Sequence, residues 1–402
     1  MKSHLLFAIH YLELGGAERS LIGLLEALDY NRVNVDLFVY NHRGGLMKMI
    51  PPQVHLLPEI HEYAQIERPL SDVFRDGYWR IVLARLKAKR QFARYAKRNH
   101  PKDGSAIFSF IMKNVVPLLP TISPTVEYDL AVSFLTPHNI VMERVRAKKK
   151  AAWIHTDYSQ IDVDQSLELP AWSSYDKIVS ISPDVTRAFL EVFPSLEHKI
   201  VEIPNILSPK LVRDRAENMS SEEIAKEMPC EKGVINLLSV GRFSSAKNYD
   251  NVPDICRRIL HEGFSVRWYI IGYGGDESLI RRKIHESGMK DYVVLLGKKE
   301  NPYPYMKACD IYVQPSRYEG NAVTVREAQI LGKPVVVTEY PTANSQVRDG
   351  QDGIIVPLDN EGCARGIAAL VSNWKKQSYL AAFCLANDFG NEAEVEKLLS
   401  LL

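Results

Sequence analysis

The chain has 402 residues, of which 46% are hydrophobic and 25% are charged, and its formal net charge is +1. This length exceeds what one hydrophobic core usually organises and predicts about two domains of ~100–200 residues each. The composition excludes an intrinsically disordered chain, and the nearly neutral charge balance argues against nucleic acid as a partner. No stretch reaches the ~18 consecutive apolar residues that indicate a transmembrane helix.

The cysteines indicate the compartment. They are odd in number, scattered along the chain and without a C-x-x-C pair: Cys230, Cys256, Cys309, Cys363 and Cys384. Such a set is typical of reduced thiols in a cytoplasmic protein and not of a disulfide framework or a zinc site. The apolar run at the start of the chain is too short for a secretory signal peptide and favours a buried first strand.

Short apolar runs alternate with helical patterns along most of the chain, which predicts parallel βαβ units. In the first half the expected strands are Leu5–His10, Val33–Tyr40, Asp129–Phe134, Ala151–His155 and Lys177–Ile181, and the expected helices are Ala17–Leu28 and Pro183–Phe193. In the second half the expected strands are Val234–Val240, Val266–Ile271, Tyr292–Leu296, Ile311–Gln314, Val335–Thr338 and Gly353–Val356. The expected helices there are Asn251–Glu262, Glu277–Ser287, Glu300–Ala308, Val323–Leu331 and Cys363–Asn373.

This alternation stops near the middle of the chain, where the polar, charged stretch from Lys210 to Lys232 is predicted to be a linker. We therefore expect an α/β protein with two Rossmann-like, doubly wound parallel-sheet domains, residues 1–207 and 208–385, facing each other across a cleft. Residues 386–402 would form a closing segment. Within it, Asn391–Leu402 is amphipathic, and we expect a helix that could pack back on the first domain.

Two pairs of charged residues mark the second domain. Arg242 and Lys247 follow a strand, and in open α/β sheets ligands bind at the carboxyl ends of strands. Two cations suit a diphosphate there, because each makes a charge-assisted hydrogen bond to phosphate oxygen. Glu319 and Glu327 follow strand Ile311–Gln314, and carboxylates accept hydrogen bonds from sugar hydroxyls. A diphosphate with sugars on both sides is a nucleotide-sugar, so this sheet edge is the predicted donor site.

Three further positions are compatible with a structural or a functional role. Gly15–Gly16 lies between a strand and a helix, where backbone amides can hold an anion, but a tight turn explains the glycines equally well. Gly272 begins a lone G-x-G after a strand, which is weak evidence for phosphate binding. His155 ends a first-domain strand and is followed closely by Asp157, and we favour a role at the site over a buried structural histidine.

Together, these residues resemble the family 4 retaining glycosyltransferases of the group 1 type, which have the GT-B fold. The resemblance extends over nearly the whole chain. Its motifs are Gly15-Gly16-x-Glu18, His155-x-Asp157, Pro204-Asn205, Gly241-Arg242 with Lys247-Asn248, Gly272-x-Gly274, Pro315-Ser316, and the E-x7-E pair Glu319 and Glu327. The Arg/Lys pair followed by E-x7-E is the most specific part of the signal.

The resemblance implies a role for each motif residue. Arg242 and Lys247 would hold the donor diphosphate and neutralise the leaving group. Glu327 would bind the ribose and Glu319 the hydroxyls of the transferred sugar, while His155 would approach that sugar from the first domain. The remaining donor-binding positions that it implies are Gly16, Gly241, Gly272, Lys299, Gly320, Asn321, Ala322, Val323 and Thr324. No Asp-x-Asp pair is placed to bind a metal, so no metal or other cofactor is expected.

The implied function is retaining transfer of a hexose-type sugar from a nucleotide-sugar, a UDP-sugar, to a hydroxyl of a lipid-linked glycan in surface polysaccharide or capsule assembly. One departure is Gly320-Asn321-Ala322, where the family usually has Gly-Phe-Gly. This variant resembles polysaccharide-assembly members and leaves the identity of the sugar open. The alternatives are a nucleotide-sugar epimerase, a phosphorylase, and a non-catalytic nucleotide-sugar-binding protein of the same architecture.

The segment from Arg75 to Lys102 is strongly basic, with one acid, Asp76. Its basic residues are Arg75, Arg80, Arg85, Lys87, Lys89, Arg90, Arg94, Lys97, Arg98 and Lys102. The apolar side chains of one helical stripe within it are Trp79, Val82, Leu83 and Leu86. A basic amphipathic segment suits an anionic membrane surface, but a helix whose apolar stripe packs on its own domain fits equally well. We expect a cytoplasmic protein for which this segment is a candidate contact with the cytoplasmic face of the membrane.

Overall fold

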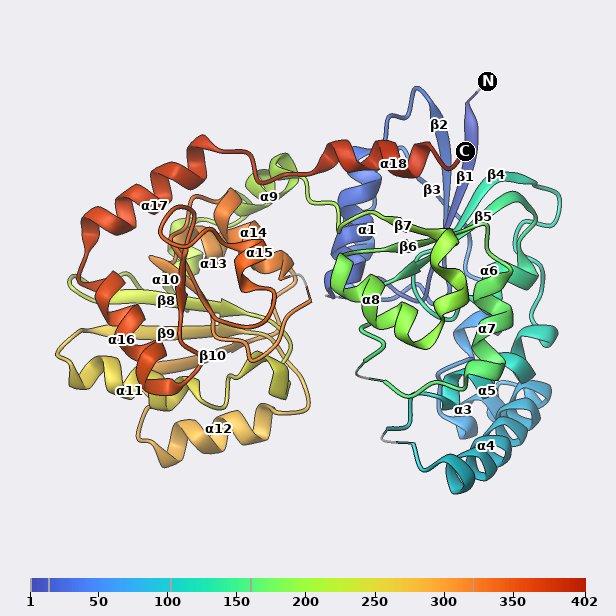
Figure 1. Ribbon diagram of the computed structural model, residues 1–402, viewed down its shortest axis with the longest axis horizontal. Helices are drawn as coiled ribbons and strands as arrows, with labels where there is room; N and C mark the ends of the chain where they lie inside the picture. The colour runs from blue at the N-terminus through green and yellow to red at the C-terminus, as the bar shows by residue number, and fades with distance from the viewer. Residues whose placement is uncertain (1, 14, 102, 160, 321) are drawn as a thin grey trace. The chain divides into compact units, whose positions relative to one another are not determined.

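The structure is a computed structural model that describes residues 2–13, 15–101, 103–159, 161–320 and 322–402. The chain divides into two compact units (Figure 1). Unit 1 consists of Met1–Ile206 and Glu392–Leu402, and unit 2 of Leu207–Asn391. Within the described residues, no helix is long and apolar enough to cross a membrane.

Unit 1 is built on a seven-stranded sheet in the order β3-β2-β1-β4-β5-β6-β7, in which all neighbouring strands are parallel. The strands are β1 (Ser3–Ile9), β2 (Val33–Val39), β3 (His55–Leu56), β4 (Tyr128–Ser133), β5 (Ala147–Ile154), β6 (Lys177–Ser180) and β7 (Ile200–Glu202). The central strand β1 is fully buried from Leu5 to Ile9, because it has neighbours on both sides and helices over the sheet. A near-continuous apolar run is typical of such a strand.

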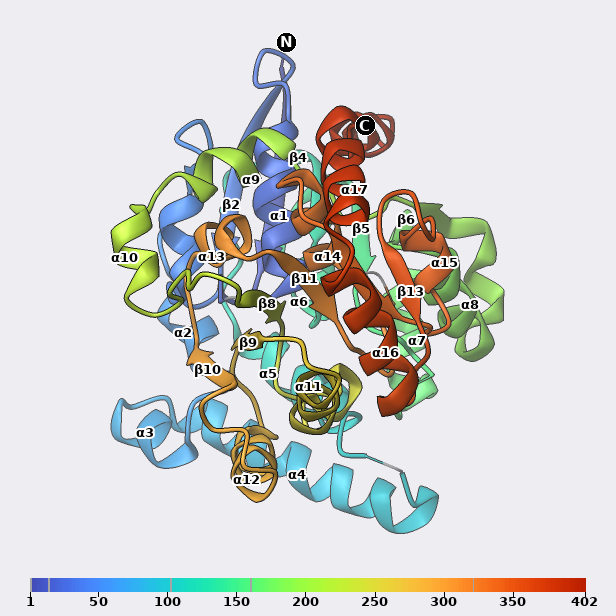
Figure 2. The same cartoon turned by 90° about the vertical axis from the view of Figure 1, so that its left-hand side faces the viewer.

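The helices of unit 1 cover the sheet and extend beyond it. They are α1 (Gly16–Ala27), α2 (His61–Ala64), α3 (Leu70–Arg75), α4 (Trp79–Asn99), α5 (Ile107–Val115), α6 (Asn139–Arg144), α7 (Gln165–Ser173), α8 (Pro183–Val192) and α18 (Val395–Leu399). The 3-10 turns are η1 (Gly45–Met49), η2 (Val116–Leu118), η3 (Pro194–Lys199) and η5 (Glu392–Glu394). Helices α3 and α4 lie at the outer edge of the unit, with α4 packed against α3 and α5 (Figures 1 and 2).

Unit 2 is built on a six-stranded parallel sheet in the order β10-β9-β8-β11-β12-β13. Its strands are β8 (Ile235–Val240), β9 (Val266–Ile271), β10 (Val293–Gly297), β11 (Ile311–Gln314), β12 (Val335–Thr338) and β13 (Ile354–Val356). Neighbouring residues of one strand belong to opposite cores: Leu238 faces one hydrophobic cluster and Leu237 the other. The side chains alternate because a strand has a period of two.

Helices lie over both faces of this sheet, as the two hydrophobic clusters show. They are α9 (Pro209–Ala216), α10 (Ser221–Ala225), α11 (Val252–His261), α12 (Glu277–Glu286), α13 (Tyr303–Ala308), α14 (Val323–Ile330), α15 (Ala343–Gln346), α16 (Asn360–Val371) and α17 (Trp374–Ala386), with the 3-10 turn η4 (Ser245–Lys247). The expectation of two doubly wound parallel-sheet domains is confirmed. Strands β9, β11 and β12 also have the expected bounds.

The prediction that Lys210 to Lys232 is a linker was wrong. The segment forms α9 and α10, whose buried residues Val212 and Ile224 join one core cluster of unit 2. Its charged side chains lie on the outer face of these short helices, so the composition resembles that of a loop. Ser220 caps α10 with a capping box, in which its hydroxyl accepts a hydrogen bond from the backbone of Glu223.

After α17 the chain returns to unit 1. Asn391 and Leu207 lie side by side where the two units connect, and the backbone N–H of Leu207 donates to the Asn391 side chain at 2.8 Å. Helix α18 then buries Leu398 and Leu399 in unit 1. An exposed ion pair of 2.6 Å joins Glu396 of this helix to Arg32.

Candidate functional site

The strand order of unit 2 reverses between β8 and β11, which are neighbours in the sheet although β9 and β10 lie between them in sequence. In doubly wound sheets the loops that leave such a pair diverge, and ligands bind in the space they leave. The loop after β8 carries Arg242 and Lys247. The loop after β11 carries Glu319 and leads into α14. The predicted donor-binding residues therefore cluster at this topological switch point.

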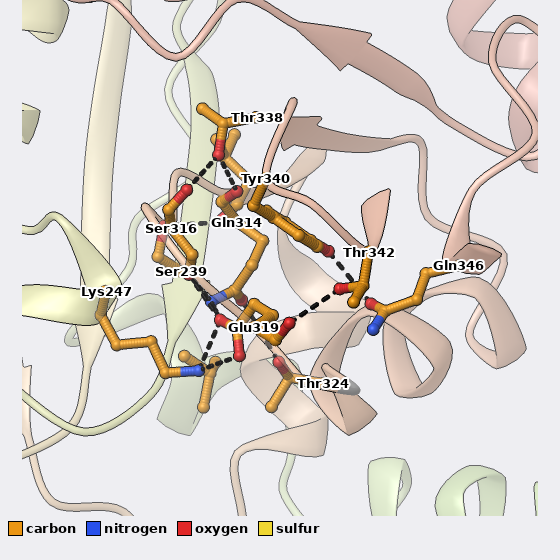
Figure 3. Close-up of polar contacts among 12 residues, drawn as sticks. Ser239, Lys247, Gln314, Ser316, Glu319, Thr324, Thr338, Tyr340, Thr342 and Gln346 are labelled. Carbon is orange, nitrogen blue, oxygen red and sulfur yellow. Dashed lines mark hydrogen bonds and ion pairs between the residues drawn. The ribbon is translucent and has the colours of Figure 1, made fainter. Parts of the chain in front are cut away.

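Lys247 and Glu319 form an ion pair across this point (Figure 3). The Lys247 ammonium lies 2.6 Å from Oε1 and 2.9 Å from Oε2 of Glu319. The Glu319 residue is 7% exposed, so the pair is largely screened from bulk water. A charge pair in such surroundings is stronger than one on an open surface.

Neutral donors from the end of β11 also hold the Glu319 carboxylate (Figure 3). The Ser316 hydroxyl donates to Oε1 of Glu319 at 2.5 Å, and the Gln314 side-chain amide donates to the same oxygen at 2.9 Å. Gln314 in turn accepts a hydrogen bond of 2.7 Å from the Tyr312 hydroxyl. The carboxylate is therefore fixed in orientation by a network rooted in the strand.

A second ion pair ties the two loops together. The Arg317 guanidinium makes two hydrogen bonds of 2.9 Å to the two carboxylate oxygens of Asp250. It also donates to the backbone carbonyl of Ser245 at 2.6 Å. A bidentate arginine–carboxylate pair has a specific geometry, so it sets the register between the loop that carries Lys247 and the loop that carries Glu319.

Arg242 is exposed, and among the described residues no ion pair or hydrogen bond of its side chain is found. Its guanidinium is thus available to an incoming anion. Gly241 and Gly272 lie behind it at the ends of β8 and β9. A Cβ on Gly272 would lie 1.9 Å from the Gly241 carbonyl oxygen, so close packing of the two loops requires glycine there. A structural requirement therefore explains Gly272 without any phosphate contact.

The N-terminus of α14 begins beside this pair. Ala322 is its N-cap residue and makes no side-chain cap, so among the described residues no N-cap side chain occupies the backbone N–H groups of the first turn. Val323 and Thr324 are partly exposed, and the Thr324 hydroxyl donates to Gln314 at 3.2 Å. A Cβ on Gly320 would meet nothing within 4 Å, which leaves room at its backbone. The predicted Asn321 contact lies outside the described residues.

Glu327 is fully buried in α14. The Tyr303 hydroxyl donates to its Oε1 atom at 2.8 Å. Lys299, another of the predicted donor-binding residues, forms an ion pair of 2.6 Å with Glu227. Glu227 also accepts a hydrogen bond of 2.6 Å from Tyr305, and Lys299 and Tyr305 together hold the pKa of Glu227 below its usual range.

Two predicted site residues, Gly16 and His155, belong to unit 1. A Cβ on Gly16 would meet nothing within 4 Å, so packing does not require glycine at this position. His155 follows β5 and packs against Phe134, with the ring centroids 4.7 Å apart. Its Nε2 atom is buried without a hydrogen-bond partner among the described residues. Burial lowers the pKa of His155 to about 3, so the ring is neutral at physiological pH.

Residues 220–383, which lie within unit 2, match the family model described as glycosyl transferases group 1. Unit 2 is a group 1 glycosyltransferase domain. Arg242, Lys247, Glu319 and Glu327 all fall inside the matched range.

Curated relatives align with part of this chain. The lipopolysaccharide core biosynthesis glycosyltransferase LpsE of Rhizobium meliloti is 26% identical over 180 residues, covering 44% of this chain and 51% of LpsE. The amylovoran biosynthesis glycosyltransferase AmsK of Erwinia amylovora is 30% identical over 145 residues, covering 34% and 35%. A Campylobacter jejuni N-acetylgalactosaminyltransferase named for a diphospho-undecaprenol-linked acceptor is 29% identical over 126 residues, covering 31% and 34%. The chain thus spans about half or less of each relative.

Solved structures with the two-domain GT-B fold match this chain over both units. HepE of Anabaena, determined in complex with UDP, has a TM-score of 0.65 at 16% identity and covers 100% of this chain and 98% of its own. TarM of S. aureus, in a complex that contains UDP, has a TM-score of 0.67 at 12% identity, with coverage of 100% and 99%. At these identities the likeness concerns the fold.

The sequence did not single out every residue of the candidate site. It missed Gln314, the strand-end residue that holds Glu319, and Tyr303, which holds Glu327. It also missed Thr342, whose hydroxyl donates to the backbone carbonyl of Glu319 at 2.8 Å. A polar residue that ends the apolar strand Ile311–Gln314 was an available signal, since it falls at the carboxyl edge. Within the described residues, no cluster of His, Cys, Asp and Glu suited to a metal ion is found.

Proposed function

We propose that the protein is a retaining glycosyltransferase. It would move a hexose-type sugar from a UDP-sugar to a hydroxyl of a glycan acceptor during surface polysaccharide assembly. The observation that carries the proposal is the convergence of Arg242, Lys247 and Glu319 at the switch point of a group 1 domain. Two cations and one oriented carboxylate match the diphosphate and the sugar of one donor.

The ion pair between Lys247 and Glu319 suggests how the donor would enter. Without a ligand, each group neutralises the other at 2.6 Å. A diphosphate can bind the ammonium, and sugar hydroxyls can donate to the carboxylate, so the donor would replace one internal pair by two ligand contacts. Arg242 would add a second cation without breaking any ion pair that the described residues form.

In the proposed reaction, the bond between the sugar C1 atom and the diphosphate oxygen breaks. The acceptor oxygen forms a new bond to C1 on the same face, and its proton passes to the departing diphosphate. Negative charge therefore accumulates on the leaving group, where Arg242 and Lys247 would stabilise it. We propose that these cations make a metal ion unnecessary.

Glu319 would position the sugar and would not act as a covalent nucleophile. Its Oε1 atom accepts hydrogen bonds from Lys247, Ser316 and Gln314, so the carboxylate is fixed in orientation by contacts to one of its oxygens. A carboxylate held in this way is suited to recognising hydroxyl groups whose positions differ between sugars.

Two comparisons support the finer parts of the proposal. The solved structures of HepE and TarM contain UDP, which supports UDP as the nucleotide of the donor. The Campylobacter jejuni relative is named for an acceptor carried on diphospho-undecaprenol, which supports a lipid-linked glycan as the acceptor. Such an acceptor would be reached at the cytoplasmic face of the membrane.

A nucleotide-sugar screen followed by a turnover assay tests the proposal. A ligand that binds only the folded state raises its melting temperature, so a UDP-sugar is expected to stand out in a thermal-shift series. Release of UDP should then require an added glycan acceptor. Formation of an epimer without an acceptor would indicate an epimerase, and a thermal shift without any turnover across an acceptor panel would indicate a binding protein. Either result would overturn the transferase proposal.

A further inference from the structure

Helix α4 is the most basic element of the protein. Eight of its 21 residues are Arg or Lys and none is acidic, although the whole chain has a net charge of only +1. Its basic residues are Arg80, Arg85, Lys87, Lys89, Arg90, Arg94, Lys97 and Arg98. The excess of positive charge is therefore concentrated on one helix at the outer edge of unit 1 (Figure 2).

One face of α4 packs on its own unit. Ile81, Val82 and Ala88 are buried on that face. Val82 therefore does not belong to the same stripe as Trp79, Leu83 and Leu86, and the predicted stripe was wrong at this one position. Arg85 is buried as well, and its guanidinium donates to the backbone carbonyls of Gln65 and Arg68 at 3.0 and 2.6 Å. Arg85 thus anchors the helix and takes no part in its outer surface.

The outer face of α4 carries large apolar side chains. Trp79 is 56% exposed, Leu83 57% and Leu86 39%, and their spacing of four and three residues places them on one stripe. Phe74, at the end of the neighbouring helix α3, is 65% exposed. The alternative that the apolar stripe packs on its own domain is therefore wrong for Trp79, Leu83 and Leu86.

Exposed cations flank and continue this stripe. Lys87, Arg90 and Arg94 are exposed, and among the described residues they form no ion pair. Arg90, Arg94 and Lys97 extend the row that begins with Trp79, Leu83 and Leu86, at spacings of three or four residues. An exposed apolar row with cations beside it matches an anionic membrane, in which acyl chains lie beneath negatively charged headgroups. A neutral membrane lacks the negative charge, and a purely polar partner lacks the apolar layer.

We infer that the outer face of α4 docks unit 1 on an anionic membrane surface, with Trp79, Leu83 and Leu86 inserted at the headgroup boundary. Phe74 extends the inserted patch, and Lys87, Arg90 and Arg94 contact lipid phosphates. The inference does not require transferase activity, because lipid binding can be measured directly. If the proposed function also holds, α4 brings the enzyme to the surface on which a lipid-linked acceptor is displayed.

Sedimentation with vesicles tests the docking. Vesicles of phosphatidylcholine mixed with the anionic lipid phosphatidylglycerol are compared with vesicles of pure phosphatidylcholine. We expect binding to the anionic vesicles only, and at least about tenfold weaker binding when salt is raised from ~0.05 to ~0.5 M, because salt screens headgroup attraction. No binding at low salt, or equal binding to neutral vesicles, would overturn the inference.

Two matched triple variants locate the surface. Lys87→Glu/Arg90→Glu/Arg94→Glu should weaken binding to anionic vesicles at least about tenfold, since three attractive contacts become repulsive. Lys232→Glu/Lys290→Glu/Lys375→Glu alters three exposed lysines of unit 2 by the same charge and should bind like the wild type. Equal losses in both variants would mean that net charge, and not α4, decides the binding.

Tryptophan fluorescence tests insertion. Trp153, Trp172 and Trp268 are buried, so Trp374→Phe leaves Trp79 as the exposed tryptophan. Its emission should shift to shorter wavelength on anionic vesicles, and lipids brominated near the headgroup should quench it. Vesicle binding without shift or quenching would exclude insertion, and tighter binding to single-stranded DNA or RNA than to vesicles would assign the face to nucleic acid instead.

Discussion

The Lys247 ammonium bridges both carboxylate oxygens of Glu319, at 2.6 and 2.9 Å, so two groups predicted to hold different parts of one donor are bonded to each other. This contact makes the unliganded site self-neutralising. It also couples recognition of the diphosphate to recognition of the sugar. A diphosphate that binds the Lys247 ammonium removes a hydrogen-bond donor from the Glu319 carboxylate, and sugar hydroxyls can replace that donor.

Arg242→Ala should lower kcat by about 10²–10³, the loss typical of removing one preorganised donor to developing charge. Its melting temperature should stay unchanged, because the side chain is exposed. Lys247→Ala should lower kcat similarly and also destabilise unit 2, because Glu319 loses its charged partner in a largely buried position. Steady-state kinetics and thermal unfolding check both, with the exposed Lys232→Ala as a control. Wild-type turnover in either variant would contradict the proposal that Arg242 and Lys247 bind the donor diphosphate.

The transfer should retain the anomeric configuration of the donor and should continue in excess EDTA. Retention follows from attack on the same face as the leaving group, and metal independence from the two fixed cations. Proton NMR of the product's anomeric signal, recorded with and without chelator, decides both points. An inverted product contradicts the proposed mechanism, whereas loss of turnover restored by added divalent metal contradicts only the metal-free part.

Glu319→Gln and Glu327→Gln should impair sugar transfer in different ways. Glu319 would contact the transferred sugar, so its loss should lower kcat and reduce discrimination between donor sugars. Glu327 would contact the ribose, so its loss should raise KM by a similar factor for every donor with the same nucleotide. Tyr303→Phe removes a hydrogen bond of 2.8 Å to Glu327 and should give a weaker form of the Glu327 defect. Competition between two UDP-sugars measures the difference, and identical effects of the two glutamate variants would refute the division of roles.

Ser316 should act as a positioning residue for Glu319. Its hydroxyl donates to Glu319 at 2.5 Å in a buried position, so Ser316→Ala should cost about 1–3 kcal/mol of stability and lower kcat more than it raises KM. Ser316→Thr keeps the hydroxyl and should restore kcat. The control Ser372→Ala removes an exposed hydroxyl whose hydrogen bond goes to a helix carbonyl. A purely structural role would change stability alone and leave the ratio of kcat to KM as in the wild type.

Unit 1 should lose stability in mild acid. Burial lowers the pKa of His10 to about 4 and the pKa values of His138 and His155 to about 3, against 6.5 in an unfolded chain. Between these values the unfolded state binds more protons than the folded state, so stability is complete above about pH 6.5 and falls as the pH drops toward 4. Urea unfolding at several pH values should show this slope. It should become shallower in His155→Phe and stay the same in His285→Ala, which alters an exposed histidine of unit 2.

The regular strands of both sheets could be predicted because their signal is local. Ile311–Gln314 and Val335–Thr338 are short apolar runs, and burial on both faces of a parallel sheet demands such runs. Strands β3 and β7 were not predicted, because two or three residues at a sheet edge carry no period. The linker predicted over α9 and α10 was wrong because only a few side chains of each helix are buried, so their composition resembles that of a loop.

The charged residues of the candidate site were visible in the sequence, but their partners were not. Arg242 and Glu319 could be predicted as site residues because each follows a strand, and ligands of open α/β sheets bind at the carboxyl ends of strands. The pairing of Lys247 with Glu319 depends on β8 and β11 being neighbours, which is a property of strand order and not of spacing along the chain. The same holds for Tyr303, which approaches Glu327 from a different helix.

The return of residues 392–402 to unit 1 reverses the expected order of folding during synthesis. Leu398 and Leu399 belong to the core of unit 1, yet the ribosome makes them only after the whole of unit 2. The first unit to be translated is therefore the last to be completed, because its final helix α18 leaves the ribosome after unit 2. A fragment of residues 1–206 would remain in that unfinished state, and joining residues 392–402 to it should complete the fold.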